Sequence, residues 1–519
     1  MGPSWLKDAV FYEVYPQSFY DSNGDGIGDL EGIIRKLEYI RDLGCNAVWL
    51  NPIYDSPFKD AGYDVRDYRK VAPRYGTMED ACRLFRRAHD LGMRVLMDLI
   101  PGHTSEEHPW FLESQKAERN RWSDRYIWTD SWFHGAPGML YIGGESERDG
   151  TYILNFFKCQ PALNYGFLHP SASWQLPADH PEAIATREAI KDIMRFWLDT
   201  GCDGFRVDMA DSLVKMDDAR KHGTCAVWRN VREMLDREYP EAAMISEWSA
   251  PELSLNAGFH MDFYLNHDGN GYESLLRDVR DGRDRSYFRK DAEDRDIRRF
   301  LDEYEAWYAS TRETGYISLM TGNHDIPRCA PRMSIRELKL AYAVLLTLPG
   351  VPFVYYGDEI GMRYRVLPTK EGGYTRTGSR TPMQWQAGKN LGFSEAAEKD
   401  LYLPVDPSED APTVEEQERD PDSLLRCVRD ILELRHRFED LQSDGAYETV
   451  VGEKDQPYVY RRGSLLMAVN PEGRSQCVML PEAVRQMVYR IGEASVTGEC
   501  LQLPAQSFAV LKVQTHTKD

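Results

Sequence analysis

The chain has 519 residues, of which 42% are hydrophobic and 12% aromatic, so it can bury a large core and is not disordered as a whole. Its formal net charge of −21 argues against nucleic acid or an anionic membrane surface as the main partner, and a neutral, polar ligand would suit it better. A single barrel with one or two smaller domains fits this length.

Short runs rich in β-branched and aromatic residues alternate with amphipathic stretches such as LEGIIRKLEYIRDL. This alternation predicts parallel βα units, and most simply a closed (β/α)8 TIM barrel. The expected strands, in chain order, are residues 11–19, 47–52, 95–100, 204–210, 243–248, 261–266, 317–325 and 351–359.

Two regions depart from this alternation. Residues 103–171 are rich in Trp, His, Gly and Ser and show no clear helix, so they are predicted to form a domain inserted after the third strand. From residue 443 the pattern changes to short alternating runs such as FAVLKV, which predicts an all-β sandwich over residues 443–519. The barrel then comprises residues 1–102 and 172–442.

The nine cysteines are odd in number, scattered, and never spaced as CxxC, which fits neither a disulfide framework nor a zinc cluster and indicates a reducing compartment. The N-terminal stretch MGPSWLKDAVFYEVYP does not resemble a signal peptide, and no apolar run approaches transmembrane length. We therefore expect a cytoplasmic protein that does not bind membranes, either as a monomer or as a small homo-oligomer.

Polar residues follow several of the expected strands, where the loops of a (β/α)8 barrel form the active face. They are Asp98 and His103 after the third strand, Arg206 and Asp208 at the fourth, Glu247 at the fifth, and Asn323, His324 and Asp325 at the seventh. Each alone is more simply a helix cap or a salt-bridge partner. Together, however, three carboxylates from three strands converge on one mouth.

The spacing of these carboxylates indicates glycoside cleavage. Because side chains alternate along a strand, Arg206 and Asp208 share a face, and the arginine should keep Asp208 ionised. Glu247 lies between Ile245 and Trp248, an apolar setting expected to raise its pKa and keep it protonated. A retaining glycosidase would need the two carboxyl groups roughly 5–5.5 Å apart.

Several motifs resemble those of a known enzyme family. GFRVDMA, ISEW, GNHD and DLIPGHTS are similar to the four short motifs of the α-amylase superfamily, glycoside hydrolase family 13. Longer stretches resemble its α-glucosidase and oligo-1,6-glucosidase branch: YPQSFYDSNGDGIGDLEGI, NPIYDSPFKDAGYDVRDY, HTSEEHPWF, QPALNY, RTPMQW and DPDSLLRCVRDILELR. The resemblance covers nearly the whole chain, and trehalose synthase and sucrose isomerase share much of the same scaffold.

The resemblance implies a role for individual residues. Asp208 matches the nucleophile, Glu247 the acid/base, and Asp325 the residue that stabilises the transition state. The other positions that match sugar-site residues of the family are Asp60, Tyr63, Asp98, His103, Arg206, His324, Arg328 and Arg376. Of these, Asp60 and Arg376 match the pair that grips the non-reducing end. The implied enzyme is a retaining, exo-acting α-glucosidase that hydrolyses short oligosaccharides and needs no organic cofactor.

Some positions depart from the family pattern. Gly102 stands where the family usually has an Asn that is a calcium ligand in many amylases, so the calcium ion between domains of those enzymes is not expected here. Ala162 and Ile326 replace residues usual in this branch, Asp and Gln respectively, and Thr377-Gly378 replaces Asp-Asn beside Arg376. Met209, which follows the position that matches the nucleophile, is not typical of either α-1,6 or α-1,4 cleavage. The sequence therefore does not determine which glycosidic linkage is cleaved.

The sequence allows two alternatives to a hydrolase. A non-catalytic relative is the first, but all three carboxylates are present. The second is a transferase or isomerase of the trehalose synthase or sucrose isomerase type, because a covalent glucosyl-enzyme can be captured by another sugar or by the released one. The acceptor-side candidates are Met209, Phe156, Phe157, Phe167 and Ile326.

The stretch DSNGDGIGD (21–29) resembles the start of an EF-hand loop, but position twelve of that loop would be Gly32 instead of Glu, and the stretch joins a strand to a helix. Oxygen atoms of Asp21, Asn23, Asp25, Ile27 and Asp29 are the expected ligands of a structural Ca2+ or Mg2+. The branch that the chain resembles often binds one ion in the matching loop. The simpler interpretation is a Gly-rich turn in which Asp29 caps the next helix.

Overall fold

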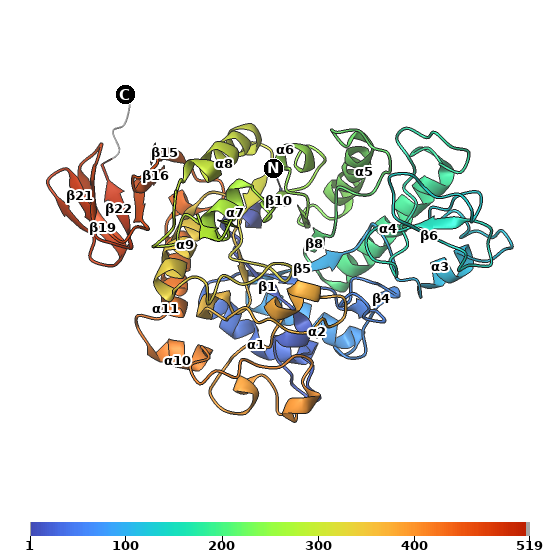
Figure 1. Cartoon of the computed structure of the whole chain (residues 1–519), viewed down its shortest axis with the longest axis horizontal. Helices are drawn as coiled ribbons and strands as arrows, with labels where there is room; N and C mark the ends of the chain where they lie inside the picture. Colours follow the sequence, from blue (N-terminus) through green and yellow to red (C-terminus); the bar gives the residue numbers. More distant parts are fainter. Residues whose placement is uncertain (1, 515–519) are drawn as a thin grey trace.

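The computed structural model describes residues 2–514, in which eight parallel strands form a barrel (Figure 1). Their order around the sheet is β13-β10-β9-β8-β5-β2-β1-β14, and a parallel bridge between Met320 and Phe353 joins the two ends. The strands are β1 (Phe11–Val14), β2 (Ala47–Leu50), β5 (Arg94–Leu99), β8 (Gly204–Val207), β9 (Ala243–Ser246), β10 (Met261–Phe263), β13 (Tyr316–Ser318) and β14 (Phe353–Tyr355). All eight expected strands are confirmed, and all except β5 are shorter than the expected run.

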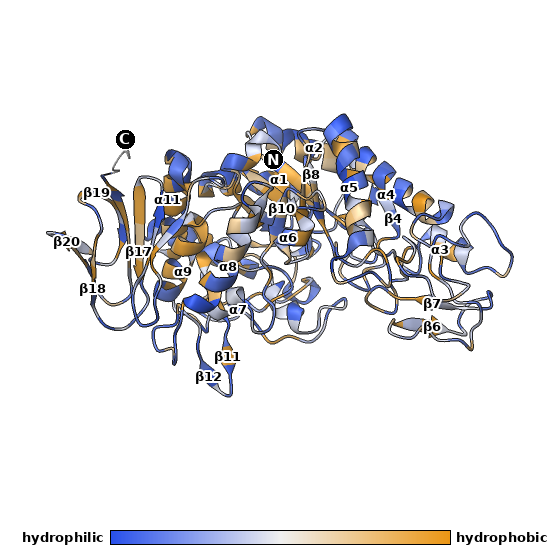
Figure 2. Cartoon of the chain, turned by 90° about the horizontal axis from the view of Figure 1, so that it is seen from above, coloured by the Kyte–Doolittle hydropathy of each residue, from blue (hydrophilic) through white to orange (hydrophobic). Residues whose placement is uncertain are grey.

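One main helix follows each barrel strand. In order these are α1 (Leu30–Leu43), α2 (Met78–Asp90), α4 (Pro181–Thr200), α5 (His222–Glu238), α6 (Pro251–Ser254), α8 (Arg298–Thr311), α9 (Ile335–Thr347) and α11 (Leu424–Arg437). Capping residues in the sequence mark the starts of three of these helices. Asp29 caps α1, and capping boxes begin α2 (Thr77 with Asp80) and α9 (Ser334 with Glu337). Figure 2 shows apolar residues on the barrel strands and polar residues on the outer faces of the helices.

Shorter elements lie in the loops of the barrel. They are the pairs β3 (Tyr54–Asp55) with β4 (Asp67–Val71) and β11 (Val279–Arg280) with β12 (Arg283–Asp284), and the helices α7 (Gly271–Leu276) and α10 (Val414–Arg419). Two 3-10 helices follow β14, namely η3 (Asp358–Ile360) and η4 (Tyr374–Ser379). Asp358 in η3 forms an ion pair with Arg328, and Arg376 in η4 reaches the mouth of the barrel.

The region inserted after β5 lies at one end of the molecule, opposite the C-terminal domain (Figures 1 and 2). It holds the hairpin β6 (Tyr141–Gly143) and β7 (Thr151–Ile153) and a small core of its own that includes Ile127, Ile153 and Phe167. The expectation of no clear helix was wrong, because α3 (Pro109–Ser114) begins with His108 as its cap and Pro109 in its first turn, a combination that favours helix initiation.

The C-terminal domain consists of two antiparallel sheets, in the orders β15-β16-β17-β22-β19 and β18-β21-β20. Its strands are β15 (Glu448–Val451), β16 (Tyr458–Arg462), β17 (Leu465–Asn470), β18 (Gln476–Met479), β19 (Val484–Ile491), β20 (Ser495–Thr497), β21 (Cys500–Leu503) and β22 (Ser507–Val513). The expected all-β character is confirmed, and residues 515–519 of the predicted domain lie outside the described residues.

Two cysteines correct an expectation from the sequence. Cys477 on β18 and Cys500 on β21 form a disulfide between paired strands, whereas the scattered cysteines had predicted none. Strand pairing brings these residues together across 23 positions of sequence, a contact that spacing alone did not reveal. Within residues 2–514, no helix is both long and apolar enough to cross a membrane.

Candidate active site

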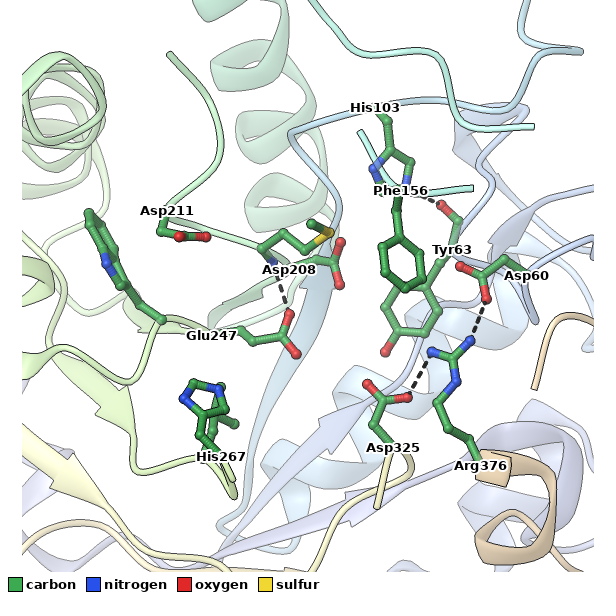
Figure 3. A pocket seen from close by; sticks show the side chains of 13 residues that line it. Asp60, Tyr63, His103, Phe156, Asp208, Asp211, Glu247, His267, Asp325 and Arg376 are labelled. Carbon is green, nitrogen blue, oxygen red and sulfur yellow. Dashed lines mark hydrogen bonds and ion pairs between the residues drawn. The ribbon is translucent and has the colours of Figure 1, made fainter. Parts of the chain in front are cut away.

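The C-terminal ends of the barrel strands open into a cavity of about 350 Å³ (Figure 3). It is lined by Asp60, Tyr63, His103, Phe156, Asp208, Met209, Asp211, Glu247, Trp248, Leu265, His267, Asp325 and Arg376. The three carboxylates predicted from the strand ends are therefore brought together, and the inserted region contributes Phe156. A volume of this size suits a small molecule such as one sugar unit.

Asp208 and Glu247 are placed by the ends of adjacent strands. The N–H of Asp208 donates to the carbonyl of Leu99 on β5 (2.9 Å), and the N–H of Glu247 donates to the carbonyl of Val207 on β8 (3.0 Å). Between them, Met209 has a φ of 42° in the left-handed region, and its N–H donates to Glu247 Oε2 (2.9 Å). The chain after β8 thus turns sharply to hold the two carboxylates beside each other.

A single buried guanidinium joins three of the carboxylates. Arg206 is 2% exposed, and its Nη1 lies 2.8 Å from Asp98 Oδ1 and 3.1 Å from Asp208 Oδ1. Its Nη2 lies 2.7 Å from Glu247 Oε1. Since an arginine stays charged when buried, this contact gives the carboxylates a fixed positive partner.

The expected electrostatic division between Asp208 and Glu247 is not observed. Burial and the charge of Glu247 raise the pKa of Asp208 well above its usual range, although Arg206 opposes them. Glu247 does not lie in an apolar pocket as its sequence neighbours suggested, because its oxygens contact Arg206 and the N–H of Met209. The guanidinium of Arg206 therefore favours the ionised form of Asp208 against the effects of burial and of the neighbouring carboxylate.

Asp325 faces the other two carboxylates from the opposite wall and has different partners (Figure 3). Its Oδ1 accepts from Arg376 (3.1 Å) and Arg380 (2.8 Å), and its Oδ2 lies 3.5 Å from His324 Nε2. Burial alone would raise the pKa of Asp325, but His324 and the arginines lower it well below its usual range. Asp325 is therefore a permanent anion at neutral pH.

Arg376 also reaches Asp60, as the resemblance implied. Its Nη2 lies 3.3 Å from Asp60 Oδ1, and Gln160 of the inserted region donates to the other oxygen of Asp60 (2.8 Å). Burial raises the pKa of Asp60 to about 6 even though Arg376 and Arg380 lower it. The unusual Gly378 in this loop has a physical reason, because a Cβ there would lie 1.6 Å from the carbonyl oxygen of Arg365.

Tyr63 lines the floor of the cavity, and His324, which is not among the lining residues, stacks on the ring of Tyr63. Their rings are parallel, with centroids 5.5 Å apart, and the phenol of Tyr63 lies 2.7 Å from His324 Nε2 and donates to Asp98 (2.9 Å). His324 Nδ1 lies 2.7 Å from Glu13 on β1. Burial lowers the pKa of His324 and raises the pKa of Glu13, so the floor is a buried network that fixes ring positions.

His103 lines the cavity with both ring nitrogens already in contact with protein groups. Nε2 lies 3.1 Å from the carbonyl oxygen of Tyr63, and Nδ1 lies 3.1 Å from the side-chain amide nitrogen of Asn155. Burial lowers the pKa of His103 to about 3, so this histidine is neutral. Asn155, the side chain that contacts Nδ1 of His103, belongs to the inserted region.

Arg328, like Asp98, Arg206 and His324, is a predicted sugar-site residue that does not line the cavity. Its Nη1 pairs with Asp358 on η3 (2.8 Å), and its guanidinium lies over the ring of Tyr355 (4.4 Å). These contacts hold the side chain of Arg328 outside the lining of the cavity. Contact between Arg328 and the sugar therefore stays a prediction.

Comparison with known proteins agrees with this geometry. Residues 13–444 match the family described as alpha amylase, catalytic domain. The chain belongs to the α-amylase family. It is thus an enzyme of glycoside hydrolase family 13, as its sequence motifs and its barrel with an inserted and a C-terminal all-β domain had suggested.

Relatives of this α-amylase family enzyme carry different names. An oligo-1,6-glucosidase of Heyndrickxia coagulans is 32% identical, covering 90% of this chain and 92% of its own length. The trehalose synthase/amylase TreS of Mycolicibacterium smegmatis is 33% identical, covering 88% of this chain and 80% of its own. Among solved structures, the trehalulose synthase MutB from Pseudomonas mesoacidophila MX-45 superposes with a TM-score of 0.81 at 26% identity, covering 99% of this chain and all of that one.

Sequence reasoning missed several residues of the site in this α-amylase family enzyme. Arg380 belongs to the motif RTPMQW but was not predicted to be a site residue, and it is buried in contact with Asp325. Glu13 was also missed; it lies inside an apolar strand and contacts His324. An ionisable residue within an otherwise apolar run was the available signal for Glu13. His267, Asp211 and Trp248 line the open side of the cavity and carried no such signal.

The loop at residues 21–29 is wrapped around its own side-chain oxygens. Asp21 accepts from the N–H groups of Asn23, Gly24 and Gly26 (2.7–3.1 Å), and Asn23 and Asp25 accept from the N–H two residues on (both 2.9 Å). Asp29 caps α1 and also accepts from Ser22, the role foreseen as the simpler interpretation.

Asp21 also accepts from Ser394 Oγ (2.5 Å), so each of its two oxygens already accepts two hydrogen bonds. Asn23 Oδ1 and Asp25 Oδ1 each accept one backbone N–H and are oxygen ligands of the kind a hard cation prefers, while no group of three or more His, Cys, Asp or Glu residues within residues 2–514 is arranged to hold a metal. A structural Ca2+ or Mg2+ bound by Asp21, Asn23, Asp25, Ile27 and Asp29 therefore stays a prediction. Its place before α1 is separate from the carboxylates of the cavity.

Chelation tests the predicted cation. If an ion stabilises the first βα loop, EDTA should lower the midpoint of thermal unfolding by several degrees, because removing a ligand that binds only the folded chain removes its binding free energy. The Asp21→Ala variant should start from the lower midpoint and show no further change with EDTA. An equal midpoint with and without EDTA in the wild-type protein would rule the ion out.

The raised pKa of Asp60 predicts a pH dependence. With its pKa raised to about 6, Asp60 is ionised above that pH and loses its charge below it, so its pair with Arg376 weakens in acid. We expect kcat/KM for a short α-glucoside to fall as the pH drops through about 6. Asp60→Asn should lower kcat/KM at neutral pH and flatten this acidic limb; a limb unchanged in the variant would assign it to another group, such as Asp98.

Proposed function

We propose that the enzyme is a retaining, exo-acting α-glucosidase that hydrolyses short oligosaccharides from the non-reducing end through a covalent glucosyl-enzyme. The observation that carries the proposal is the pairing of Asp208 and Glu247 on Arg206, inside one cavity whose far wall holds Asp325. The relatives named oligo-1,6-glucosidase support the hydrolytic choice.

The wall formed by Asp60 and Arg376 supports exo action. Charged groups joined to each other and to Asp325 occupy the end of the cavity away from Glu247 (Figure 3). A terminal glucosyl unit can present its hydroxyls to these groups, because carboxylates accept and a guanidinium donates hydrogen bonds. A chain that continued beyond this unit would meet the ion pair, so the proposed substrate ends there.

The first chemical step breaks the glycosidic bond. Asp208 attacks the anomeric carbon from the face opposite the leaving oxygen, forming a β-linked glucosyl ester, while Glu247 transfers its proton to that oxygen. This step requires Asp208 to be ionised and Glu247 to carry a proton, and Arg206 stabilises the charge on Asp208. The anionic Asp325 is placed to stabilise the positive charge that develops on the ring in the transition state.

The second step returns the enzyme to its first state. Glu247, now ionised, removes a proton from water as the water oxygen attacks the anomeric carbon, and the Asp208 ester bond breaks. Two inversions restore the α configuration of the released glucose. Met209 and Arg206 hold the carboxylate of Glu247 where both transfers need it.

A second function is supported by the relatives named trehalose synthase/amylase and by the neighbouring isomaltulose synthase structure from Erwinia rhapontici NX5 with sucrose, which superposes with a TM-score of 0.80. In this alternative the glucosyl-enzyme is captured by a sugar instead of water. Phe156, Met209, Trp248 and Leu265 line the open side of the cavity and would cover such an acceptor. How well they exclude water would decide the outcome.

Product analysis separates the two functions. We expect separate incubations with maltose, isomaltose, trehalose and sucrose to give glucose as the main product of at least one of them, because exposed side chains such as Phe156 and His267 line part of the cavity and leave it open to water. The products can be resolved by chromatography over the full time course. An isomeric disaccharide as the main product would replace hydrolysis with the isomerase alternative.

Azide tests the roles of the two carboxylates. With an activated α-glucoside, Asp208→Ala should lose about 10⁴-fold or more in kcat, and azide should restore turnover as β-glucosyl azide, because the anion enters in place of the missing carboxylate. Glu247→Ala should still form the ester on Asp208, so azide should give α-glucosyl azide. NMR of the products distinguishes the anomers, and the same anomer from both variants would contradict the assignment.

A further inference from the structure

Gly102 leaves space beside His103 that a side chain from the inserted region fills. A Cβ at position 102 would lie 2.6 Å from Nδ2 of Asn155, closer than real contacts allow. Asn155 follows β7, so its amide reaches from the inserted region to the end of β5 through this gap. The position at which the family usually has Asn is thus occupied from elsewhere in the chain.

The amide of Asn155 lies between a lysine and a histidine. Its Oδ1 accepts from Lys215 Nζ (3.0 Å), and its Nδ2 lies 3.1 Å from His103 Nδ1 and 3.7 Å from the sulfur of Met209. Lys215 also donates to the carbonyl of Ser212 (2.6 Å) in the loop after β8. Burial lowers the pKa of Lys215 to about 8, which still leaves it an ammonium at neutral pH.

The chemistry of these groups determines the orientation of each one in turn. An ammonium only donates hydrogen bonds, so the amide oxygen of Asn155 must face Lys215 and the NH2 must face His103. An NH2 group only donates, so Nδ1 of His103 must accept. Since His103 is neutral, its proton is then on Nε2, where the carbonyl oxygen of Tyr63, which can only accept, lies 3.1 Å away.

We propose that Lys215 and Asn155 are positioning residues that fix His103 as its Nε2–H tautomer. The positive charge of Lys215 determines which way the amide of Asn155 points, and the amide determines which nitrogen of His103 carries the proton. His103 therefore presents its Nε2–H at the wall of the cavity, where the carbonyl of Tyr63 accepts it and where a bound sugar hydroxyl would be a second acceptor for the same proton. This last contact rests on the proposed function; the tautomer does not.

Nitrogen NMR of histidine tests the tautomer directly. In the protein labelled with 15N-histidine at neutral pH, two-bond nitrogen–proton correlations should show His103 with a protonated Nε2 and an unprotonated Nδ1, its signals being identified by their loss in His103→Gln. In Asn155→Ala and Lys215→Met only the carbonyl of Tyr63 still constrains the tautomer, and we expect the Nδ1–H form to appear beside the Nε2–H form. An Nδ1–H tautomer in the wild type, or an unchanged pattern in both variants, would overturn the proposal.

Kinetics separates positioning from general damage. Asn155→Ala and Lys215→Met should lower kcat/KM by roughly tenfold, as expected for one misdirected hydrogen bond. Lys158→Met is the matched control, since Lys158 is an exposed lysine of the inserted region that pairs with Glu145 (3.1 Å), and it should change neither the His103 signals nor kcat/KM. A changed tautomer with unchanged kcat/KM would uphold the positioning and overturn the sugar contact of His103.

Discussion

The site depends on one buried positive charge. Arg206 contacts carboxylates that come from the ends of three neighbouring strands: Asp98 on β5, Asp208 after β8 and Glu247 after β9. Without that guanidinium, three negative groups could not be buried side by side at the end of the barrel. The order of the strands decides which carboxylates can share it, so the barrel itself creates the charge arrangement from which the proposed chemistry follows.

A second set of charges completes the cavity from distant parts of the chain. Asp325 is held ionised by Arg376 and Arg380, and Arg376 continues to Asp60. One carboxylate is thus permanently charged, while burial and the charge of Glu247 raise the pKa of Asp208 on the other side of the cavity. Groups with such different proton affinities in one small space are the physical basis for proposing glycoside cleavage.

The period of the apolar runs was sufficient to predict the eight strands and the converging carboxylates, because both follow from local sequence and a known barrel rule. What failed depended on contacts between distant residues. Ile245 and Trp248 flank Glu247 in the sequence and suggested an apolar setting, but Arg206 from the next strand contacts it. The Cys477–Cys500 pair likewise needed the pairing of two strands to become visible.

The most direct measurement traps the proposed intermediate. Fluorine at C5 of an α-glucosyl fluoride slows both steps by destabilising the positive charge on the ring, while the fluoride leaving group lets the first step proceed, so a covalent glucosyl-enzyme should accumulate. After proteolysis, mass spectrometry should find the fluoroglucosyl group on the peptide that contains GFRVDMA, attached to Asp208. An adduct on another residue, or turnover with no covalent adduct and an inverted product, would contradict the account.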